Sequence, residues 1–377
     1  MTTTTLTADQ GLSANLPASA RTRIEVLDAL RGFAILGIFL INIPLMAPAG
    51  DMGLRVGDVP WYDALAQTVT DLFFEGTQRG LLEMLFGAGM MILTAKALTA
   101  DGPIGIADTY LRRNMWLVLF GLLHIFVVRW GYDILHVYGL AALFLFTFRT
   151  LPAAAALAAG LVIAGSLQYA AAAGYAPGAP NGSGAAEIKG AVQIWYETVK
   201  GLGLWMTVAE AFGTMLIGVA LFKWGIIQGR KSERFYLMMM ILGYGLGAAL
   251  RLMPLSGQTS LSGGPSPSEF GRIIMTLGHV GMMNCLWKTR VGVRLLSPLL
   301  AAGRTAFSLY VMQSLIGIWV LWAPWGPLTQ LNLGSAGVMG VVICVVALQV
   351  ILANLWLRKF DMGPLEMLWR RLVKLAS

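Results

Sequence analysis

Charged residues are scarce in this chain. Only 12% of its 377 residues are Asp, Glu, Lys or Arg, whereas soluble globular proteins carry about 25%. Hydrophobic residues make up 57%, and apolar runs of roughly 18 or more residues recur, each long enough to cross a membrane as a helix. The short alternating segments of a membrane β-barrel are not present in the sequence. The composition therefore excludes a soluble domain and predicts an all-α, polytopic membrane helix bundle.

Cysteine is also rare, since the chain has only Cys285 and Cys344. They fall in different apolar runs and lack the spacing of metal ligands, so we predict neither a disulfide nor a metal site. The net charge of +8 is spread over alternate loops instead of forming one basic patch. This distribution indicates membrane topology and excludes a nucleic-acid partner, which leaves the lipid bilayer as the expected surroundings.

The apolar runs predict about ten spans, and the charges between them predict both termini in the cytoplasm. We expect a bacterial inner membrane as the location. Alternate connecting segments hold 19 Lys and Arg residues and the opposite segments hold 7. Because cytoplasmic loops are enriched in these residues, the larger set marks the cytoplasmic side. The spans are expected at roughly 29–48, 70–96, 111–130, 132–149, 152–173, 205–227, 233–251, 270–288, 296–322 and 336–357.

The domain organisation follows from the segments between and around the spans. Residues 1–22 are rich in Thr, Ala and Ser and predict a disordered cytoplasmic tail. Residues 23–377 form one transmembrane domain, whose spans at 29–173 and 205–357 are separated by an outer linker at 174–204 that begins with Pro, Gly and Ser. The last residues, 363–377, predict an amphipathic helix from Pro364 that lies on the anionic cytoplasmic leaflet.

Four ionisable side chains interrupt the apolar stretch GLLHIFVVRWGYDILHVYG, residues 121–139. Residues 129–131 predict a tight outer turn, which brings His124, Asp133 and His136 to a similar depth on its two arms. Each buried ionisable group costs about 2.5–3.5 kcal/mol on insertion scales, and such groups generally mark functional sites. We predict that His124 is a general base oriented by Asp133, with a structural hydrogen bond as the alternative. His136 is a candidate for substrate binding, although contact with a neighbouring helix is the simpler interpretation.

Other polar residues fall near this layer. Arg79 and Glu83 stand four residues apart in GTQRGLLEMLFGAG and therefore on one helix face. His279 lies nearer the middle of a later span. We assign these three residues to substrate binding. The alternative for Arg79 and Glu83 is an internal ion pair with each other. For His279 and for Glu210, the alternative is packing against a neighbour that forms a hydrogen bond with them.

Arginines gather at the predicted cytoplasmic ends of the spans. Arg31 follows Asp28 by three residues, so an ion pair between them is one interpretation. Guanidinium groups are also the usual partners of phosphate groups. We therefore predict that Arg31, together with Arg112, Arg113 and Arg304, holds a phosphate-bearing donor at the membrane entrance.

Six segments resemble the YeiB-like membrane proteins, the domain-of-unknown-function 418 family. In chain order they are RIEVLDALRGFAILGIFLINI, LLEMLFGAGMM, YLRRN…LLHIF…WGYDILHVYGL, EAFGTMLIGVALFKWGII, AAGRTAFSLYVMQSLI and ANLWLRKFDMGPLEMLWRRL. The resemblance runs from about Arg23 to Leu372. The first span is also similar to heparan-α-glucosaminide N-acetyltransferase and to the acyltransferase-three family, which pass an acyl group from cytoplasmic acyl-CoA to an acceptor across the membrane. The resemblance implies the same reaction class, with acyl-CoA (acetyl-CoA) as co-substrate and an unidentified extracytoplasmic acceptor.

The first span departs from the acyltransferase-three pattern at one position. Those proteins carry an arginine, ten intervening residues and a histidine, whereas here Arg31 is followed at that spacing by Asn42. The base must then come from elsewhere, and His124 is the best replacement. Asn42 is assigned to a hydrogen bond with the substrate carbonyl or the oxyanion. An acyl-histidine intermediate is the alternative to direct transfer.

Two functions of other classes compete with the acyltransferase. A transporter of a small metabolite would use the buried ionisable residues as a path, and a structural or regulatory partner would use them as contacts between helices. The sequence shows no inverted repeat and no matched pair of broken helices, which disfavours the transporter. A homodimer is left open by every one of these hypotheses.

Overall fold

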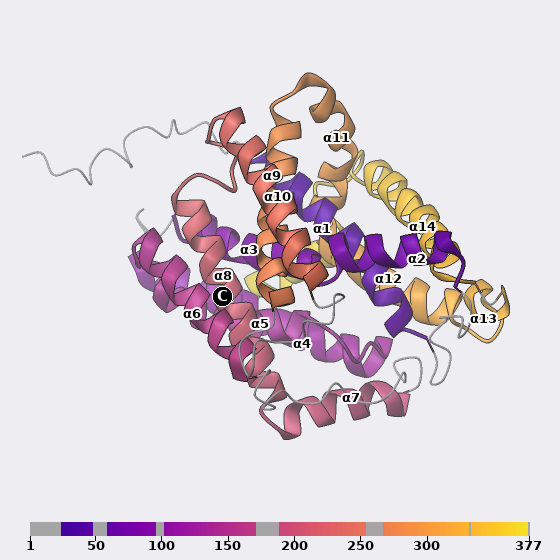
Figure 1. Cartoon of the computed structure of the whole chain (residues 1–377). Helices are drawn as coiled ribbons and strands as arrows, with labels where there is room; N and C mark the ends of the chain where they lie inside the picture. The colour runs from indigo at the N-terminus through magenta and orange to yellow at the C-terminus, as the bar shows by residue number, and fades with distance from the viewer. Residues whose placement is uncertain are drawn as a thin grey trace, which may run out of the picture.

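The computed structural model describes residues 24–47, 59–95, 102–170, 188–253, 267–331 and 333–375. Within these ranges the regular secondary structure is helical, with no strand (Figure 1). The predicted tail, 1–22, and the first part of the predicted linker, 174–187, lie outside them. The α-helices are α1 (Glu25–Leu45), α2 (Trp61–Val69), α3 (Thr77–Thr94), α4 (Gly102–Leu123), α5 (Leu135–Leu145), α6 (Ala153–Ala170), α7 (Ile188–Lys200), α8 (Gly203–Lys223), α9 (Glu233–Leu252), α10 (Pro267–Trp287), α11 (Arg290–Arg304), α12 (Ala306–Ile316), α13 (Pro327–Leu331), α14 (Ser335–Trp356) and α15 (Pro364–Leu375).

Several helices are long and apolar enough to cross a membrane. By length and composition, five segments of the described chain meet this requirement, and a sixth is added if α11 and α12 are counted together as one bent span. The five are Glu25–Leu45, Gly105–Val128, Gly203–Lys223, Glu233–Leu252 and Ser335–Trp356. Two shorter apolar helices, Leu135–Phe148 and Ala153–Leu167, lie among them. The protein is therefore an all-α membrane protein, as the composition predicts.

The predicted continuous span at 296–322 is broken in the structure. It divides at Thr305 into α11 and α12, and the two helices meet at an angle of 81°. The carboxylate of Glu366 accepts hydrogen bonds from the backbone N–H of Phe307 at 2.8 Å and of Ser308 at 3.3 Å. These are donors that the first turn of a helix leaves unsatisfied. Glu366, which stabilises the break, lies 58 positions after Ser308. The local sequence around Thr305 therefore does not predict the break.

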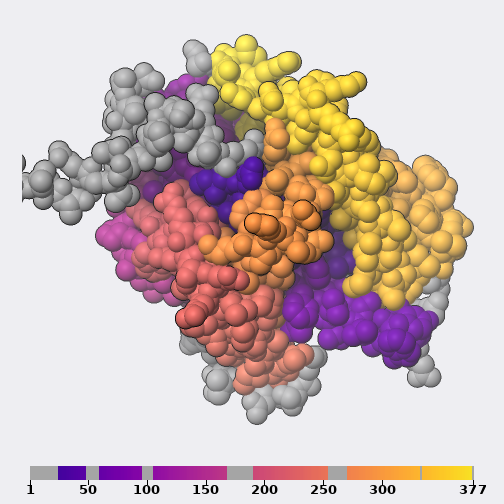
Figure 2. Space-filling view, turned by 90° about the horizontal axis from the view of Figure 1, so that it is seen from above, coloured from indigo at the N-terminus to yellow at the C-terminus, as the bar shows by residue number. Residues whose placement is uncertain are grey.

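The C-terminal helix α15 begins at Pro364, the residue at which the sequence predicts its start. Trp369 fixes it to α4, because its indole N–H donates to the carbonyl oxygen of Arg113 at 2.9 Å. The Arg113 guanidinium carbon also lies 4.3 Å from the centre of the Trp369 ring system. In Figure 2 the yellow C-terminal residues lie at one edge of the molecule, and the purple segment that contains α2 lies towards the opposite edge.

The described end of the predicted linker contains a helix instead of a coil. Helix α7 lies beside α4 (Figure 1) and packs against residues 124–128 at the end of that helix. Its buried residues Ala191 and Ile194 contact Gly131. The helix is short, and exposed Gln193, Glu197 and Lys200 interrupt its apolar residues, which is why hydropathy alone misses it. Helix α7 thereby covers the turn that carries the candidate site.

The crossing of α3 and α8 depends on two glycines. A Cβ atom on Gly87 would lie 2.0 Å from the carbonyl oxygen of Met215, and a Cβ atom on Gly218 would lie 2.1 Å from that of Met84. Both contacts are far shorter than van der Waals contact and involve backbone atoms, which cannot rotate away. Glycine is therefore required here so that the two helix backbones can approach each other.

Gly87→Ala and Gly89→Ala are expected to change the stability of the protein in opposite directions. Both residues lie on α3, but a Cβ atom on Gly89 has nothing within 4 Å. Gly89→Ala should stabilise by up to about 1 kcal/mol, because alanine is the better helix former. Gly87→Ala should destabilise by about 1–3 kcal/mol, because it overpacks the crossing. Thermal unfolding in lipid nanodiscs measures both effects, and equal melting temperatures for the two variants would contradict the close approach.

Candidate functional site

The candidate site is built on the hairpin between α4 and α5. Helix α4 ends in a π-helical turn, His124–Val128, and Arg129 then adopts a left-handed conformation with φ of 73°. The backbone N–H of Trp130 donates to the carbonyl oxygen of His124 at 3.2 Å. Gly121 lets the two arms close, since a Cβ atom there would lie 2.3 Å from the backbone nitrogen of His136. The turn predicted at residues 129–131 is present and brings the ionisable residues of its two arms together.

Asp133 joins the two histidines of the hairpin. Its Oδ1 atom lies 2.7 Å from Nδ1 of His124, and its Oδ2 atom lies 3.0 Å from Nδ1 of His136. The backbone N–H of His136 also donates to Oδ2 at 3.0 Å. An ionised carboxylate only accepts hydrogen bonds, so each imidazole donates through Nδ1 and, when neutral, keeps Nε2 as an acceptor. This is the orientation that a histidine needs in order to act as a general base.

Tyr310 of α12 supports the same carboxylate and is not identified by the sequence analysis. Its hydroxyl donates to Oδ1 of Asp133 at 3.4 Å and accepts from the indole N–H of Trp130 at 3.1 Å and the backbone N–H of Ile134 at 3.3 Å. Its ring also meets the His124 ring edge to face, with centroids 5.0 Å apart. Tyr310 lies 177 residues after Asp133, and no motif connects the two.

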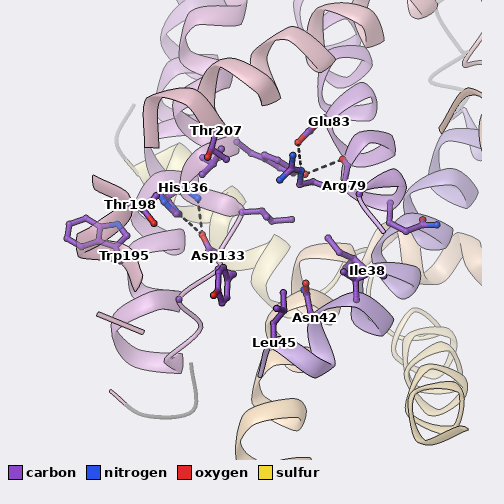
Figure 3. A pocket seen from close by; sticks show the side chains of 18 of the residues that line it. Ile38, Asn42, Leu45, Arg79, Glu83, Asp133, His136, Trp195, Thr198 and Thr207 are labelled. Atoms are coloured by element: carbon purple, nitrogen blue, oxygen red, sulfur yellow. Dashed lines mark hydrogen bonds and ion pairs between the residues drawn. The ribbon is translucent and has the colours of Figure 1, made fainter. Parts of the chain in front are cut away.

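A cavity of about 380 Å³, which we call the His136 hollow, lies beside the hairpin. Asp133 and His136 face it from α5 and the preceding turn, and Arg79 and Glu83 face it from α3 (Figure 3). Asn42 lines it from α1. Its polar lining includes Asn42, Gln78, Arg79, Glu83, Asp133, His136, Glu197, Thr198 and Thr207. Helix α7 contributes Trp195 to the lining.

An ion-pair network lies next to this hollow. The Nε atom of Arg79 lies 3.3 Å from Oε1 of Glu83, and the same arginine bonds Glu210 of α8. Arg272 of α10 also pairs with Glu210, at 2.9 Å. The predicted interaction between Arg79 and Glu83 is present, but it belongs to a larger network that holds α3, α8 and α10 together. From the sequence, Glu210 is expected only to pack against a partner, and no pattern identifies Arg272 as that partner.

A second cavity, of about 210 Å³, lies on the other side of α5, and we call it the Arg113 hollow. It contains three of the four arginines predicted to hold a phosphate-bearing donor. Its polar and aromatic lining includes Arg31, Arg113, Asn114, Arg304, Tyr310 and Trp369, together with the carboxylate-bearing Glu366. Arg112 is not among the residues that line the cavity, and its side chain bonds Asp108 on the same helix.

The two hollows share a wall. Ile134 and Tyr138 line both of them, so the first turn of α5 separates one cavity from the other. Asp133 lines the His136 hollow and Tyr310 lines the Arg113 hollow, and the hydrogen bond between these two residues passes through the wall. The arginines therefore lie on one side of α5 and the paired histidine and carboxylate on the other.

Two predicted site residues occupy other places. His124 lines neither hollow, and its buried Nε2 atom has no hydrogen-bond partner in the part of the chain that is described. His279 lies away from both hollows, where its Nε2 atom bonds the carbonyl oxygen of Phe73 at 2.7 Å and its Nδ1 atom lies 2.9 Å from the Tyr244 hydroxyl. Of the three histidines in the chain, only His136 lines one of the two hollows.

Comparison with known proteins identifies relatives over almost the whole chain. Residues 221–376 match the family model described as "Protein of unknown function (DUF418)". The uncharacterized protein YxaH of Bacillus subtilis is 27% identical, with 95% of this chain and 96% of that protein aligned. The uncharacterized protein YeiB of Escherichia coli is 26% identical, with 94% of this chain and 97% of that protein aligned.

Proposed function

The chain is a YeiB-like member of the DUF418 family, and from the geometry of its two hollows we propose that it is a transmembrane acyltransferase. It moves an acyl group, in the first instance acetyl, from acyl-CoA in the Arg113 hollow to an acceptor in the His136 hollow. The observation that carries this proposal is the shared wall formed by Ile134 and Tyr138. A donor and an acceptor bound on its two sides would meet there.

The proposal includes an orientation in a bacterial inner membrane, with ten spans and both termini in the cytoplasm. The spans are α1, α3, α4, α5, α6, α8, α9, α10, α11 with α12, and α14. The excess of Lys and Arg in alternate connections supports this orientation. Arg370, Arg371 and Lys374 of α15 support it as well, because a basic interfacial helix favours an anionic leaflet. The Arg113 hollow, which lies against α15, would then open to cytoplasmic acyl-CoA.

In the donor hollow, arginines would hold the phosphate groups of acyl-CoA. Arg31 bonds Asp28 at 2.9 Å and Arg304 bonds the carbonyl oxygen of Asp361 at 2.6 Å. These contacts fix the two side chains at the cavity and leave further N–H donors on each guanidinium group. Bidentate contact with phosphate oxygens is the interaction for which arginine is best suited. Arg113, stacked on Trp369, would supply the third cation.

In the acceptor hollow, His136 replaces His124 as our candidate base. Its Nδ1 atom is held by Asp133, and its Nε2 atom has no hydrogen bond within the described chain. During transfer, Nε2 would take the proton of an acceptor hydroxyl or amine as its oxygen or nitrogen attacks the thioester carbon. The new ester or amide bond forms, the C–S bond breaks, and the proton passes to the thiolate to give free CoA.

His124 becomes a positioning residue in this scheme. It lies behind Asp133 and holds the carboxylate from the side opposite to His136, at 2.7 Å. Asp133 can then stabilise the imidazolium that forms on His136. Asn42 remains the candidate partner of the substrate carbonyl or the oxyanion, since it lines the same hollow. An acyl-His136 intermediate is the covalent variant of the same mechanism.

A transporter is the second candidate, and the same wall favours it. Two cavities separated by Ile134 and Tyr138 are also what alternating access requires, with the buried ionisable residues as a substrate or proton path. Binding of acyl-CoA separates the two functions, because the transporter has no need of it.

Acetyl-CoA is expected to raise the melting temperature of the purified protein in nanodiscs by several degrees. A ligand at 100 times its Kd adds about 2.7 kcal/mol to the stability of the folded state. Arg113→Ala should reduce this rise by more than half. Arg112→Ala is the matched control, because Arg112 is the neighbouring arginine on the same helix and does not line the hollow.

Release of free CoA, followed by mass spectrometry, adds a second readout to the same experiment. Slow release from acetyl-CoA by the wild type, together with the thermal shift, supports the acyltransferase. If millimolar acetyl-CoA gave neither CoA release nor a thermal shift, the acyltransferase proposal would be wrong. Proton-dependent solute uptake by liposomes that contain the protein would then support the transporter.

A further inference from the structure

The two hollows are lined by charges of opposite sign. Three arginines and one carboxylate line the Arg113 hollow, namely Arg31, Arg113, Arg304 and Glu366. Three carboxylates and one arginine line the His136 hollow, namely Glu83, Asp133, Glu197 and Arg79. The first turn of α5 therefore separates a cationic cavity from an anionic one.

The arginine of the His136 hollow is already neutralised by carboxylates. Arg79 pairs with Glu83 at 3.3 Å and also with Glu210. Glu210 is shared with Arg272, at 2.9 Å. Two guanidinium groups thus face two carboxylates in this network, so Arg79 leaves no excess of positive charge to attract an anionic ligand.

Asp133 and Glu197 add negative charge to the hollow, and neither pairs with a lysine or arginine of the described chain. Asp133 is bonded by His124 and His136, whose imidazoles are neutral when Nε2 is an acceptor. Glu197 accepts a hydrogen bond from the neutral amide group of Gln193 at 2.7 Å. Even with one imidazole protonated, an excess of negative charge remains. Such an excess is costly in a membrane protein, where the effective dielectric constant is low, and it favours a bound cation.

His136 also presents an unpartnered nitrogen to the hollow. The residue is 5% exposed, and its Nε2 atom has no hydrogen bond within the described chain. Unlike the Nε2 atom of His124, it is not among the unpartnered atoms that the protein encloses completely. In a neutral imidazole this nitrogen accepts a hydrogen bond. An ammonium group donates one and also balances the charge of the carboxylates.

The remaining lining favours an organic cation over a metal ion. The volume of about 380 Å³ falls in the range of small-molecule sites. Trp195 and Tyr132 line the hollow, and the faces of such rings attract cations. Figure 3 shows Trp195 on the same side as His136, with Asn42 across the hollow. Within the described residues, no group of three or more His, Cys, Asp and Glu side chains is placed to hold a metal ion.

We infer that the His136 hollow binds an organic cation, a primary amine in its ammonium form. The Nε2 atom of His136 accepts a hydrogen bond from the ammonium group, and the charges of Asp133 and Glu197 attract it. Binding of this ligand does not depend on acyl transfer, because a transporter of organic cations would use the same site. The identification of the amine as the acceptor does rest on the proposed function.

In that case the reaction forms an amide. His136 takes one proton from the ammonium group and returns it to water, which leaves a neutral amine. The amine nitrogen attacks the thioester carbon, the C–N bond forms and the C–S bond breaks. A second proton from the nitrogen passes through His136 to the thiolate. The products are the amide, free CoA and one proton.

Saturation-transfer NMR tests the ligand class with n-butylamine, n-butanol and butyrate, which are cationic, neutral and anionic probes of similar size. The protein is placed in phosphatidylcholine nanodiscs, whose lipid is zwitterionic, and the signal from empty nanodiscs is subtracted. The butylamine signal should exceed each of the other two by at least about fivefold, the effect of one unit charge at about 4 Å in water.

Glu197→Gln and Glu197→Lys change the charge of the hollow in two steps. Glu197 is exposed, so both variants should melt at the wild-type temperature. The butylamine signal should fall about threefold for Glu197→Gln, because an exposed ion pair contributes little, and further for Glu197→Lys. The same two substitutions at Glu233, an exposed carboxylate of α9 that does not line the hollow, should leave the signal unchanged.

Inorganic cations are tested in the same experiment. Sodium chloride and potassium chloride at equal ionic strength should lower the butylamine signal equally, because both only screen the charges. A loss specific to sodium would make the hollow a site for an inorganic cation and overturn the inference. Equal signals from the three probes, a preference for butanol or butyrate, or wild-type binding by Glu197→Lys would also overturn it.

The inference and the proposed function can fail separately. Selective binding of butylamine, with neither a thermal shift nor CoA release from acetyl-CoA, would support the inference and contradict the acyltransferase. A thermal shift and CoA release without selective binding of butylamine would support the acyltransferase and contradict the inference. If both hold, butylamine and acetyl-CoA together should give N-butylacetamide, which mass spectrometry detects.

Discussion

His136→Ala is expected to lower the rate of acyl transfer by about 10²–10⁴-fold, the usual contribution of a general base. The protein should remain folded, because Asp133 keeps most of its partners. These are His124 at 2.7 Å, the Tyr310 hydroxyl at 3.4 Å and the backbone N–H of residue 136 at 3.0 Å. The loss should fall on kcat, since the arginines that would bind the donor lie on the other side of α5. Steady-state release of CoA in the presence of an acceptor measures it.

His279→Ala is the matched control for this substitution. His279 is also a buried histidine, but both of its ring nitrogens are bonded and it lies outside both hollows. Its replacement should lower the melting temperature without a comparable loss of kcat. His124→Ala should lower kcat less than His136→Ala and shift the pH profile, because it acts through Asp133. Full activity of His136→Ala together with complete inactivity of His124→Ala would restore His124 as the base.

The hairpin could be predicted from the sequence because its geometry is local. His124, Asp133 and His136 lie within thirteen residues, and a turn at residues 129–131 is sufficient to bring the first two together. Which imidazole faces a cavity depends instead on α1, α3 and α7, which surround the hairpin in space. Periodicity within residues 121–139 contains no information on those contacts. The sequence therefore predicts the group of residues, whereas the structure places His136, and not the predicted base His124, in the lining of the hollow.

Contacts between distant segments explain the remaining differences. Tyr310 reaches Asp133 only because the chain bends at Thr305, and that bend depends on Glu366 in the last helix. In the sequence, Gln78 is an ordinary polar residue at the start of a span. In the structure, α1 packs beside it and its amide group is buried. Such residues are identified as buried polar side chains that lack a hydrogen-bond partner, which requires the three-dimensional structure.

Glu210→Leu is expected to destabilise the protein by about 3–5 kcal/mol, the usual effect of removing one partner from a buried ion pair. Glu210 is bonded by Arg79 and by Arg272, whose side chain is only 5% exposed. Without Glu210, Glu83 would be the only carboxylate left to balance two guanidinium groups in the network. Thermal unfolding in nanodiscs measures the effect. Glu233→Leu, which replaces an exposed carboxylate in the first turn of α9, should change the stability by about 1 kcal/mol or less.

The double substitution Glu210→Leu with Arg272→Leu tests whether charge balance is the cause. It leaves Arg79 paired with Glu83 at 3.3 Å, so one cation again faces one carboxylate. The double variant should be more stable than Glu210→Leu alone, because a buried ion pair replaced by apolar residues of similar volume is often neutral or stabilising. If the two leucines instead add their separate losses, Glu210 contributes through packing between α3, α8 and α10 and not through charge balance.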